Sequence, residues 1–469
     1  MSRFKIWLRT FPLILLMVLF NIFLSVKVFA APLYFVPVTK SLPDGTTISL
    51  FMSGDEFFNY LHDINGFPIG IGSDGYYYYL IQDKDNFLLT SYRFGISDPF
   101  KIAGIKTVTT PSYVASKRST YQKQMEESSS GKGVKSFTKS SGVFNNLVIY
   151  IKFFNEAGFT VQRSTYETRL NSLTNSSLRT YYREISYGKL DVVSYHMPGD
   201  ATTNLCYTDN NLRSYYEVYN VSTNTNGYKN DSERTTREHN LLANAIYWVT
   251  ANYSMPAGVN FDLNQDGIFD NICFIVKGNS EGWSDLLWPH RWVLYSQNVK
   301  IGNLKVYGYT LQMENVSVNT FSHEMFHALG APDLYHYNNN DEPVGPWDIM
   351  ASGSGHPGAW MKYKYGGWID NMTELTESGT YSIKALVQNK NNCYLIKSPY
   401  RSDQVFVLEY RQKTGTYESQ IPSSGLIIQR IDNNCTGNAD GPPDEIYIFR
   451  KDGALQLQGD INSAAFSDL

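Results

Sequence analysis

The stretch FSHEMFHALGAPD, residues 321–333, places side chains at the spacing that zinc chemistry requires. On a helix, residues four apart share one face, so His323 and His327 can direct two imidazoles at one ion. Glu324 then lies beside the open coordination position, where it can accept a proton from a water molecule bound to the metal. We therefore predict a helix that carries two zinc ligands and a general base.

A third ligand is expected from Asp333, three residues after Gly330. Glycine adopts left-handed backbone conformations that a Cβ disfavours, so Gly330 lets the chain leave the helix and return Asp333 toward the ion. A bare H-E-x-x-H pattern also arises by chance, but the full spacing H-E-x-x-H-x-x-G-x-x-D is more specific. Zinc sites with two His and a Glu take that Glu roughly 20 residues after the second His, and Trp347 occupies that position here.

The segment WDIM, which ends at Met350, is placed like the Met-turn that lies under the metal in metzincins. Tyr335, His336 and His356 are the candidates for stabilising an oxyanion or contacting a substrate. In this interpretation Zn²⁺ lowers the pKa of its water toward about 7, and Glu324 accepts the proton and passes it to the leaving amine.

A second metal pattern, DLNQDGIFD, begins at Asp262. Its alternating oxygen donors, a glycine for the sharp turn and a later acid match the start of a calcium loop. An EF-hand needs a bidentate Glu at the twelfth position, which here is Cys273, so a carboxylate from elsewhere would have to complete the site. Bound Ca²⁺ and a plain Asx-rich turn both stay open. The predicted calcium ligands are Asp262, Asn264, Asp266 and Asp270.

The composition favours a folded, sheet-rich protein. Charged residues make up 18% and aromatic residues 15% of the 469 residues, which is unlike a disordered chain. A chain of this length implies roughly two to four domains. The net charge of -4 gives no indication of a nucleic-acid partner.

Residues 1–30 have the pattern of a secretory signal peptide. They carry four basic residues and no acidic one, an apolar run over Phe11–Val26, and Ala30 before the expected cleavage point. An uncleaved membrane anchor is the alternative, because the apolar run is long. No other segment suits a bilayer, so we expect a secreted protein without stable membrane insertion once the signal is removed. Export fits four cysteines, whose pairing stays open: Cys206, Cys273, Cys393 and Cys435.

Residues 31–106 contain short strand-like segments separated by turn signals such as PDG and SDG, which predicts a small β-rich unit. Residues 107–142 are rich in Ser and Lys and lack apolar periodicity, as is typical of an exposed linker. A folded unit joined by an accessible linker suggests a propeptide and a processing region, and an ordinary accessory domain is the alternative. No cysteine lies between Ala31 and Leu205, so this unit cannot silence a zinc ion with a thiolate.

Residues 143–372 mix strand and helix patterns, including a buried strand at Leu147–Phe154 and another strand at Lys305–Asn315. Residues 373–469 return to short strands such as QVFVLEYR and GLIIQRID. The expected fold is α+β, with a metzincin-like zinc protease catalytic domain between a β-rich N-terminal propeptide and a β-rich C-terminal domain.

Six segments together resemble the immune-inhibitor-A-like family of secreted bacterial metalloproteases: GDEFFNYLHDINGFPIG, REISYGKLDV, FDLNQDGIFDN, LLWPHRW, FSHEMFHALGAPDLY and PWDIMASGSGHPGAWMKYKYGGWI. The resemblance covers nearly the whole chain after residue 30. It implies a propeptide, a zinc-dependent catalytic domain, calcium sites, a β-rich C-terminal region and hydrolysis of extracellular proteins. By resemblance to metzincins, Lys305–Asn315 is expected to be an edge strand that binds the substrate backbone. Members of the family generally continue beyond a stretch like GLIIQRID, so the β-rich C-terminal domain is expected to be truncated.

The predicted function is that of a secreted zinc-dependent endopeptidase acting on extracellular proteins or peptides. The alternative is a catalytically inactive, metal-stabilised protein that binds a surface, a matrix or a glycan. Glu324 argues against this alternative, because a purely structural site has no use for a base beside the ion. Structural zinc sites also normally have four protein ligands, and three are evident here.

Overall fold

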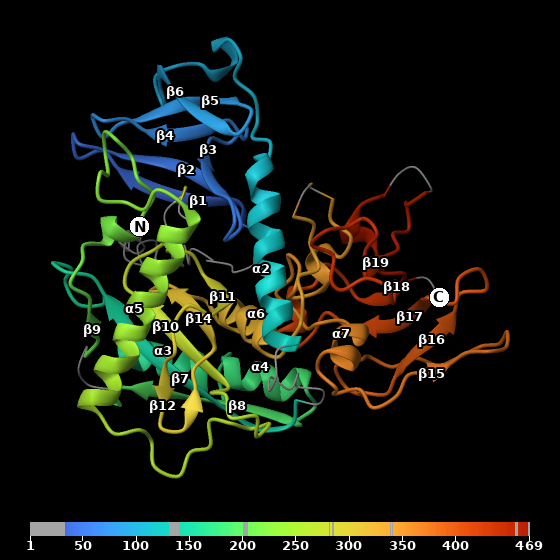
Figure 1. The fold of residues 1–469 in the computed structure, drawn as a ribbon. Helices are drawn as coiled ribbons and strands as arrows, with labels where there is room; N and C mark the ends of the chain where they lie inside the picture. Colours follow the sequence, from blue (N-terminus) through green and yellow to red (C-terminus); the bar gives the residue numbers. More distant parts are fainter. Residues whose placement is uncertain are drawn as a thin grey trace, which may run out of the picture.

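The computed structural model describes residues 33–130, 140–199, 205–280, 282–283, 286–337, 339, 341–454 and 458–467. The predicted signal peptide, residues 1–30, lies outside this part of the chain. Figure 1 shows an N-terminal sheet above a central domain of strands and helices, with a further sheet beside the central domain at the C-terminal end. Strands and helices both contribute to the fold, so the α+β class predicted from the sequence is confirmed.

The N-terminal unit, residues 33–111, is built on a six-stranded antiparallel sheet in which each strand pairs with the next. The turn signals fall between strands, where Gly45 and Gly75 adopt positive φ angles of 82° and 80°. The hydrophobic core of this unit includes Leu50 and Ile69 and is completed by Trp288 from the central domain. The strands are β1 (Leu33–Ser41), β2 (Thr47–Gly54), β3 (Asn59–His62), β4 (Pro68–Ile71), β5 (Tyr77–Asp83) and β6 (Asn86–Arg93).

Much of the segment predicted to be an exposed linker, residues 107–142, is helical. Helix α2 spans Ser112–Ser130 and descends from the N-terminal unit along the central domain (Figure 1). The carboxylate of Asp85 fixes its first residue by accepting hydrogen bonds from the backbone N and the Oγ of Ser112, at 2.7 and 2.5 Å. Val114 and Arg118 are buried. One apolar and one charged residue do not give the repeated apolar spacing by which a helix is recognised in a sequence. Residues 131–139 of the predicted processing region lie outside the described residues.

The central sheet has the strand order β11-β14-β10-β7-β8, with β9 beside β7. Alternate residues of β7 point to opposite faces: Tyr150 joins a core with α3, α4 and α6, whereas Ile149 joins a core with α5. Because helices cover both faces, β7 is apolar without interruption from Leu147 to Ile151, as predicted for Leu147–Phe154. The strands are β7 (Gly142–Lys152), β8 (Leu190–Met197), β9 (Tyr207–Thr208), β10 (Asn271–Val276), β11 (His290–Val293) and β14 (Gly308–Met313). The helices are α3 (Arg163–Asn171), α4 (Leu178–Ile185), α5 (Asp231–Asn252), α6 (Val318–Ala328) and α7 (Ala359–Lys364).

The edge of the central sheet is not the strand that the sequence suggested. We expected Lys305–Asn315 at the edge, but β14 lies between β10, to which it is parallel, and β11, to which it is antiparallel. The edge strand is β11, which comes earlier in the chain. The prediction was wrong because it took the strand just before the zinc helix to be the outermost one, whereas the crossovers of the chain set the order of a mixed sheet.

The C-terminal strands form a third sheet that shares a hydrophobic core with the central domain. Val407 and Ile427 of this sheet belong to the same buried cluster as Phe326 and Met350. The boundary near residue 372 therefore separates two sheets but not two cores. The strands are β15 (Thr373–Glu374), β16 (Cys393–Lys397), β17 (Gln404–Arg411), β18 (Gly425–Asp432) and β19 (Ile446–Ile448).

Short elements complete the described structure. A small hairpin is formed by β12 (Lys300–Ile301) and β13 (Leu304–Lys305). The 3-10 helices are η2 (Pro99–Lys101), η3 (Arg213–Tyr216), η4 (Gly345–Trp347), η5 (Glu418–Gln420) and η6 (Ile461–Ser463). All four cysteines are free thiols. Among the helices that the structure describes, none has the length and apolar character needed to cross a bilayer.

Candidate metal centre

Helix α6 carries the residues of the predicted zinc motif. Ser317 caps its N-terminus by accepting a hydrogen bond from the backbone N of Thr320 at 3.1 Å, a common way to satisfy a free N–H at a helix start. The helix ends at Ala328, and Gly330 follows with a φ of 98°. This left-handed residue turns the chain back, so that Asp333 returns to the helix face that carries the histidines, as expected from the sequence.

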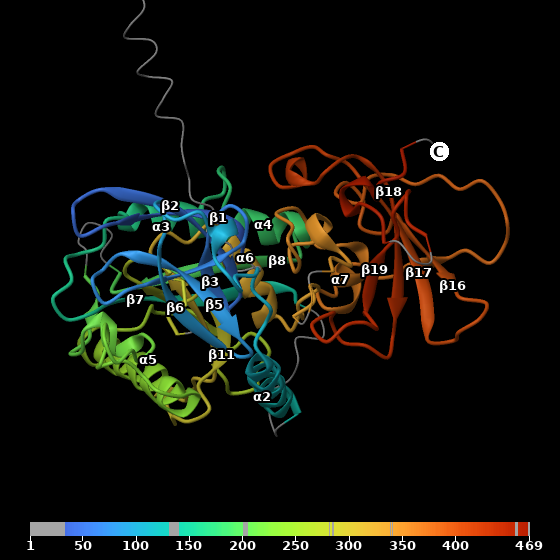
Figure 2. The same cartoon turned by 90° about the horizontal axis from the view of Figure 1, so that it is seen from above.

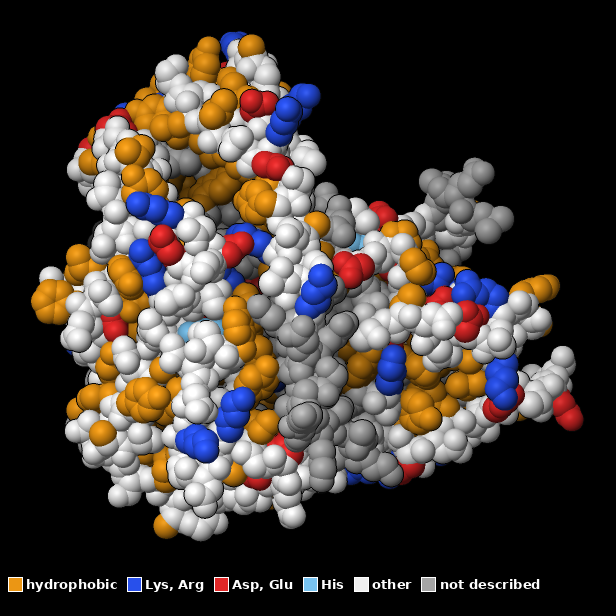
Figure 3. Space-filling view, in the orientation of Figure 1, with side chains coloured by type: hydrophobic (Ala, Val, Ile, Leu, Met, Phe, Trp, Pro, Cys, Tyr) orange, Lys and Arg blue, Asp and Glu red, His pale blue; other side chains and the backbone are white. Residues whose placement is uncertain are grey.

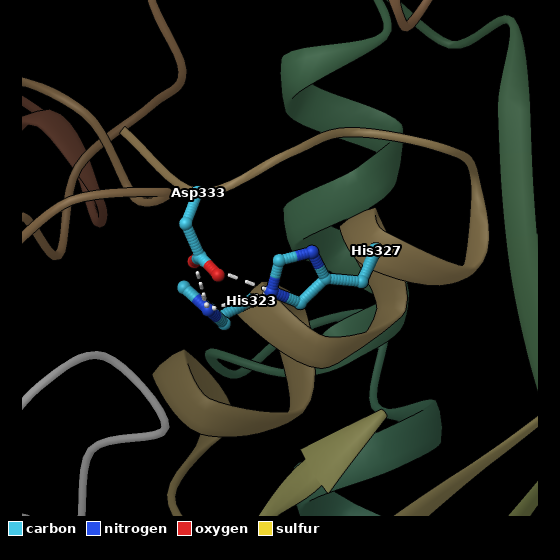
Figure 4. A group of neighbouring side chains, drawn as sticks. All are labelled: His323, His327 and Asp333. Atoms are coloured by element: carbon cyan, nitrogen blue, oxygen red, sulfur yellow. Dashed lines mark hydrogen bonds and ion pairs between the residues drawn. The ribbon is translucent and has the colours of Figure 1, made fainter. Parts of the chain in front are cut away.

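The structure brings His323, His327 and Asp333 together (Figure 4). The two Nε2 atoms are 3.1 Å apart, and each lies 3.3 Å from Oδ1 of Asp333. Ligand atoms at 2.0–2.1 Å from a tetrahedral zinc ion lie roughly 3.3–3.4 Å from one another. The triangle of donor atoms therefore has the size of one face of a zinc tetrahedron.

The other ring nitrogen of each histidine contacts a backbone carbonyl. Nδ1 of His323 lies 2.8 Å from the O of Ile349, and Nδ1 of His327 lies 2.8 Å from the O of Ala331. Each Nδ1 therefore carries a proton and donates it, which leaves Nε2 as the ring nitrogen that can bind a metal in place of a proton. Two lone pairs and a carboxylate oxygen directed at one point repel each other unless a cation lies between them, so the residues present fit a bound metal ion.

Asp333 is fixed by a neighbour that the sequence did not single out. The hydroxyl of Tyr337 donates to its Oδ2 at 2.5 Å, while Oδ1 has no partner among the described residues except the two imidazoles. Burial opposes its ionisation, but His327 and His323 outweigh burial and hold the pKa of Asp333 well below its usual range. Burial likewise disfavours a charged His323, yet Asp333 and Glu324 raise its pKa to about 9. The site thus attracts positive charge.

Met350, the predicted Met-turn residue, is hydrogen-bonded to the chain just after the third ligand. Its side chain is fully buried, and its carbonyl accepts a hydrogen bond from the backbone N of Leu334 at 2.7 Å. The preceding residue, Ile349, supplies the carbonyl that orients His323. His323, and Leu334 just after Asp333, are therefore both hydrogen-bonded to the same short segment, Ile349 and Met350.

Glu324 follows the first ligand and is 3% exposed, with no hydrogen-bond donor to its Oε2 among the described residues. Burial raises the pKa of its carboxyl, while the charges of His323, His327 and His290 oppose the shift. A carboxylate with a raised pKa is a better proton acceptor, which suits the role of a general base.

The three oxyanion candidates lie in different surroundings. Tyr335 is buried, and its hydroxyl has no hydrogen-bond partner among the described residues. Burial and then the charge of Asp333 raise its pKa well above the usual range, so Tyr335 stays a candidate. His336 contacts Asn339 and Asp444 through its two ring nitrogens, at 2.8 and 2.5 Å.

His356 is engaged in a buried charge network. Its Nε2 lies 2.8 Å from Glu184 and its Nδ1 lies 3.2 Å from Nζ of Lys362. Both ring nitrogens of His356, like those of His336, therefore serve other partners. The structure brings neither imidazole into the metal cluster, and the prediction of an oxyanion role is not supported for these two histidines.

The predicted calcium loop is a tight turn closed by its own carboxylates. Asp262 accepts hydrogen bonds from the backbone N atoms of Asp266 and Gly267 at 2.9 and 3.0 Å. The carboxylate of Asp270 accepts from the N of Leu263 at 3.0 and 3.2 Å. Burial, with the charges of Asp262 and Asp266, raises the pKa of Asp270 to about 8. Among the described residues these acids do not meet in a compact cluster as the zinc ligands do.

Two further residues near the centre form a buried pair. His290 of β11 lies 2.8 Å from Oε1 of Glu238 in α5, and 2.7 Å from the carbonyl of Trp288. Although burial opposes ionisation, His290 lowers the pKa of Glu238 to about 2. This buried pair joins the edge strand to α5. No signal linked the two positions, because they are 52 residues apart.

The centre is of the metallopeptidase type. Its helix carries a His-Glu pair and a second His, and an Asp returns to the same face. The helix packs on a mixed sheet that has helices on both faces. Residues 152–373 match the family model described as the immune inhibitor A peptidase M6 catalytic domain. The match confirms, for this region, the resemblance found in the sequence.

Curated relatives point the same way. The chain is 26% identical over 231 residues to the pre-pro-metalloprotease PrtV of Vibrio cholerae serotype O1, in strain M66-2 and in strain ATCC 39315 / El Tor Inaba N16961. The alignment covers 44% of this chain and 24% of each relative, so the chain spans about a quarter of the length of the relatives it matches. The family and these relatives support a metalloprotease.

Replacing Asp333 by Ala is expected to abolish stable metal binding, because one corner of the donor triangle is lost. Replacing Tyr337 by Phe should weaken zinc binding by about 10-fold, since partners behind a ligand contribute roughly 10- to 100-fold to metal affinity. Elemental analysis after dialysis and competition with a chromogenic chelator measure both effects. His336→Ala is the matched control, and the ligand assignment is wrong if that variant loses the metal while Asp333→Ala keeps it.

Proposed function

We propose that this chain is a secreted zinc-dependent endopeptidase with an N-terminal propeptide. The observation that supports it most is the convergence of two Nε2 lone pairs and Oδ1 of Asp333 on one point, with Glu324 next to the first ligand. Secretion rests on the pattern of residues 1–30, and the propeptide on the N-terminal unit and the segment that follows it.

In this proposal His323, His327 and Asp333 hold the zinc ion. Bound there, zinc would lower the pKa of a water molecule and polarise the carbonyl of the scissile peptide bond. Glu324 accepts a proton from the attacking water and delivers it to the leaving amine, and its buried position strengthens it as a base. Tyr335 is the candidate donor to the oxygen that becomes negative during the attack.

Strand β11 is the best-placed element for binding a substrate backbone. It forms the antiparallel edge of the central sheet, and an extended peptide can add to such an edge through main-chain hydrogen bonds. His290 and Glu238 hold this strand against α5. Extracellular proteins or peptides are the proposed substrates.

The competing function is a metal-stabilised binding protein without catalysis. A proteolysis assay with the secreted protein separates the two, with casein as substrate and a zinc chelator as inhibitor. We expect hydrolysis that the chelator abolishes and added zinc restores. Tight zinc binding without any hydrolysis, after removal of the N-terminal unit, would favour the binding protein.

Calcium in the Asp262–Asp270 loop stays a proposal. Burial, and then the charges of Asp262 and Asp266, raise the pKa of Asp270, so a bound cation would favour its ionised form and would stabilise the folded state by mass action. We expect millimolar Ca²⁺ to raise the melting temperature of the wild type and to have no effect on Asp270→Asn. Asp74→Asn, in an exposed turn of the N-terminal unit, is the matched control. An equal response of wild type and Asp270→Asn would leave the loop as a plain Asx-rich turn.

A further inference from the structure

The segment that leads to the edge strand β11 packs into the N-terminal unit. Trp288, two residues before β11, is fully buried in the core of the N-terminal sheet. The indole N–H of Trp283 donates to the carbonyl of Ile69 at 2.9 Å. At Gly282 an added Cβ would come within 2.5 Å of the side chain of Leu61. The contact is therefore close, and Figure 2 shows the N-terminal strands lying over the central domain.

The turn between β2 and β3, residues 55–58, extends from this unit toward the metal centre. Asp55 shapes the turn, because its Oδ1 accepts hydrogen bonds from the backbone N atoms of Phe57 and Phe58, both at 2.9 Å. The other oxygen of Asp55 pairs with Arg118 of α2. Arg118 is only 4% exposed and also donates to the backbone carbonyl of Tyr337. One buried guanidinium thus joins the turn, α2 and the residue that supports Asp333.

Aromatic packing surrounds the same turn. The ring of Phe57 lies 5.4 Å from that of Tyr337, and the ring of Phe58 lies 6.2 Å from that of Trp283. Both phenylalanines belong to one buried cluster with Tyr335 and Tyr337. Hydrophobic side chains are visible in the hollow beneath the N-terminal unit in Figure 3. The turn therefore rests on the same tyrosines that flank the third ligand.

Glu56 stands at the tip of this turn and is half-buried. Burial raises the pKa of its carboxyl well above the usual range. The negative charge of Asp55 adds to the shift, and so do the charges of Asp333 and Glu324. The turn geometry places residue 56 on the same side of the centre, because its neighbour Phe57 packs on Tyr337 and its neighbour Asp55 pairs with Arg118, which donates to the carbonyl of Tyr337. The acids of the site repel an ionised Glu56. A divalent cation held by the three ligands would reverse this effect and attract the carboxylate.

We propose that residues 55–58 form an autoinhibitory plug, in which Glu56 is held against the metal centre by the Asp55–Arg118 pair and by Phe57 and Phe58. The catalytic-domain surface around Tyr335, Tyr337 and Trp283 is the docking surface, and the occupant is this turn of the chain itself. The inference rests on the proposed function and adds the means by which the centre is blocked. It needs no thiolate, in agreement with the absence of cysteine from the N-terminal unit.

The full-length chain with zinc bound tests the plug through Glu56→Gln and Arg118→Ala. Both variants should hydrolyse a fluorogenic peptide at least about 10-fold faster than the wild type. Each removes a charged group that holds the plug in place, and interactions of charged groups contribute more to such a contact than neutral hydrogen bonds do. Asp98→Asn and Arg93→Ala are the matched controls, since both side chains lie on the N-terminal unit away from the turn. Glu56→Gln preserves size and shape, so it tests the idea even if Arg118→Ala fails to fold.

A second readout does not depend on hydrolysis. Zinc release to excess EDTA, followed with a chromogenic zinc indicator, should be at least about 10-fold faster in both variants than in the wild type. Wild-type rates of zinc release and hydrolysis in both variants would overturn the plug, and would leave the peptidase intact if hydrolysis still depends on Glu324. Faster zinc release without hydrolysis in any form of the chain would support the cover over the metal but refute the peptidase.

Discussion

Replacing Glu324 by Gln is expected to remove nearly all proteolysis while the fold and the zinc content stay the same. Gln has the size and shape of Glu but cannot accept a proton from water or pass one to the leaving amine. General acid–base catalysis contributes about 10²- to 10⁴-fold to rates, so kcat should fall by at least that factor. Hydrolysis of casein and elemental analysis of the same preparation measure the two quantities together, with about one zinc ion per chain expected in each.

The matched control is Glu374→Gln, because Glu374 lies on the surface strand β15 and pairs with Lys397 at 2.8 Å. That variant should retain full activity. Undiminished hydrolysis by Glu324→Gln would refute the assignment of the base. Loss of zinc from Glu324→Gln would instead show that the residue supports the metal, and the kinetic comparison would then need the metal-replete protein.

The part of the metal centre that could be predicted is the part that is local in sequence. His323 and His327 are one helical turn apart, and Gly330 and Asp333 follow within six residues, so helix geometry and one left-handed residue determine their arrangement. Tyr337 and His290 reach the centre through tertiary packing. Nothing in their own sequence neighbourhoods indicates those contacts.

The same distinction explains which features of the fold were predicted. The buried strand β7 follows from a continuous apolar run, because its two faces meet two helical layers. The order of the central sheet could not be read from the chain, since β11 precedes β14 and yet lies outside it. Helix α2 was missed because its described contacts run through Val114 and Arg118 rather than through a repeated apolar stripe.

Arg411 of β17 links the C-terminal sheet to the segment beneath the metal centre. It donates to the carboxylate of Glu418 at 2.5 and 2.8 Å and to the backbone carbonyls of Trp347 and His356 at 2.8 and 3.1 Å. Those carbonyls lie on either side of Met350. Burial disfavours a charged Glu418, yet Arg411 outweighs burial and lowers the pKa of Glu418 to about 2. Because that pKa is depressed, the pair stabilises the fold above about pH 4.5 and loses this effect as the pH falls toward 2.

Replacing Arg411 by Met is therefore expected to destabilise the whole chain rather than the C-terminal sheet alone. Removing one partner of a buried ion pair leaves an uncompensated charge and costs about 3–5 kcal/mol of unfolding free energy, which corresponds to a fall in melting temperature of roughly 3 to 5 °C for a chain of this length that unfolds in one transition. Thermal unfolding followed by circular dichroism and by zinc release should show one shared, lowered transition, because Val407 and Phe326 lie in a single core. Arg401→Met is the matched control: Arg401 is half exposed and pairs with Asp403 on the surface, so its loss should cost no more than about 1 kcal/mol. Two separate transitions, with zinc release unchanged, would show that the C-terminal sheet folds independently of the metal centre.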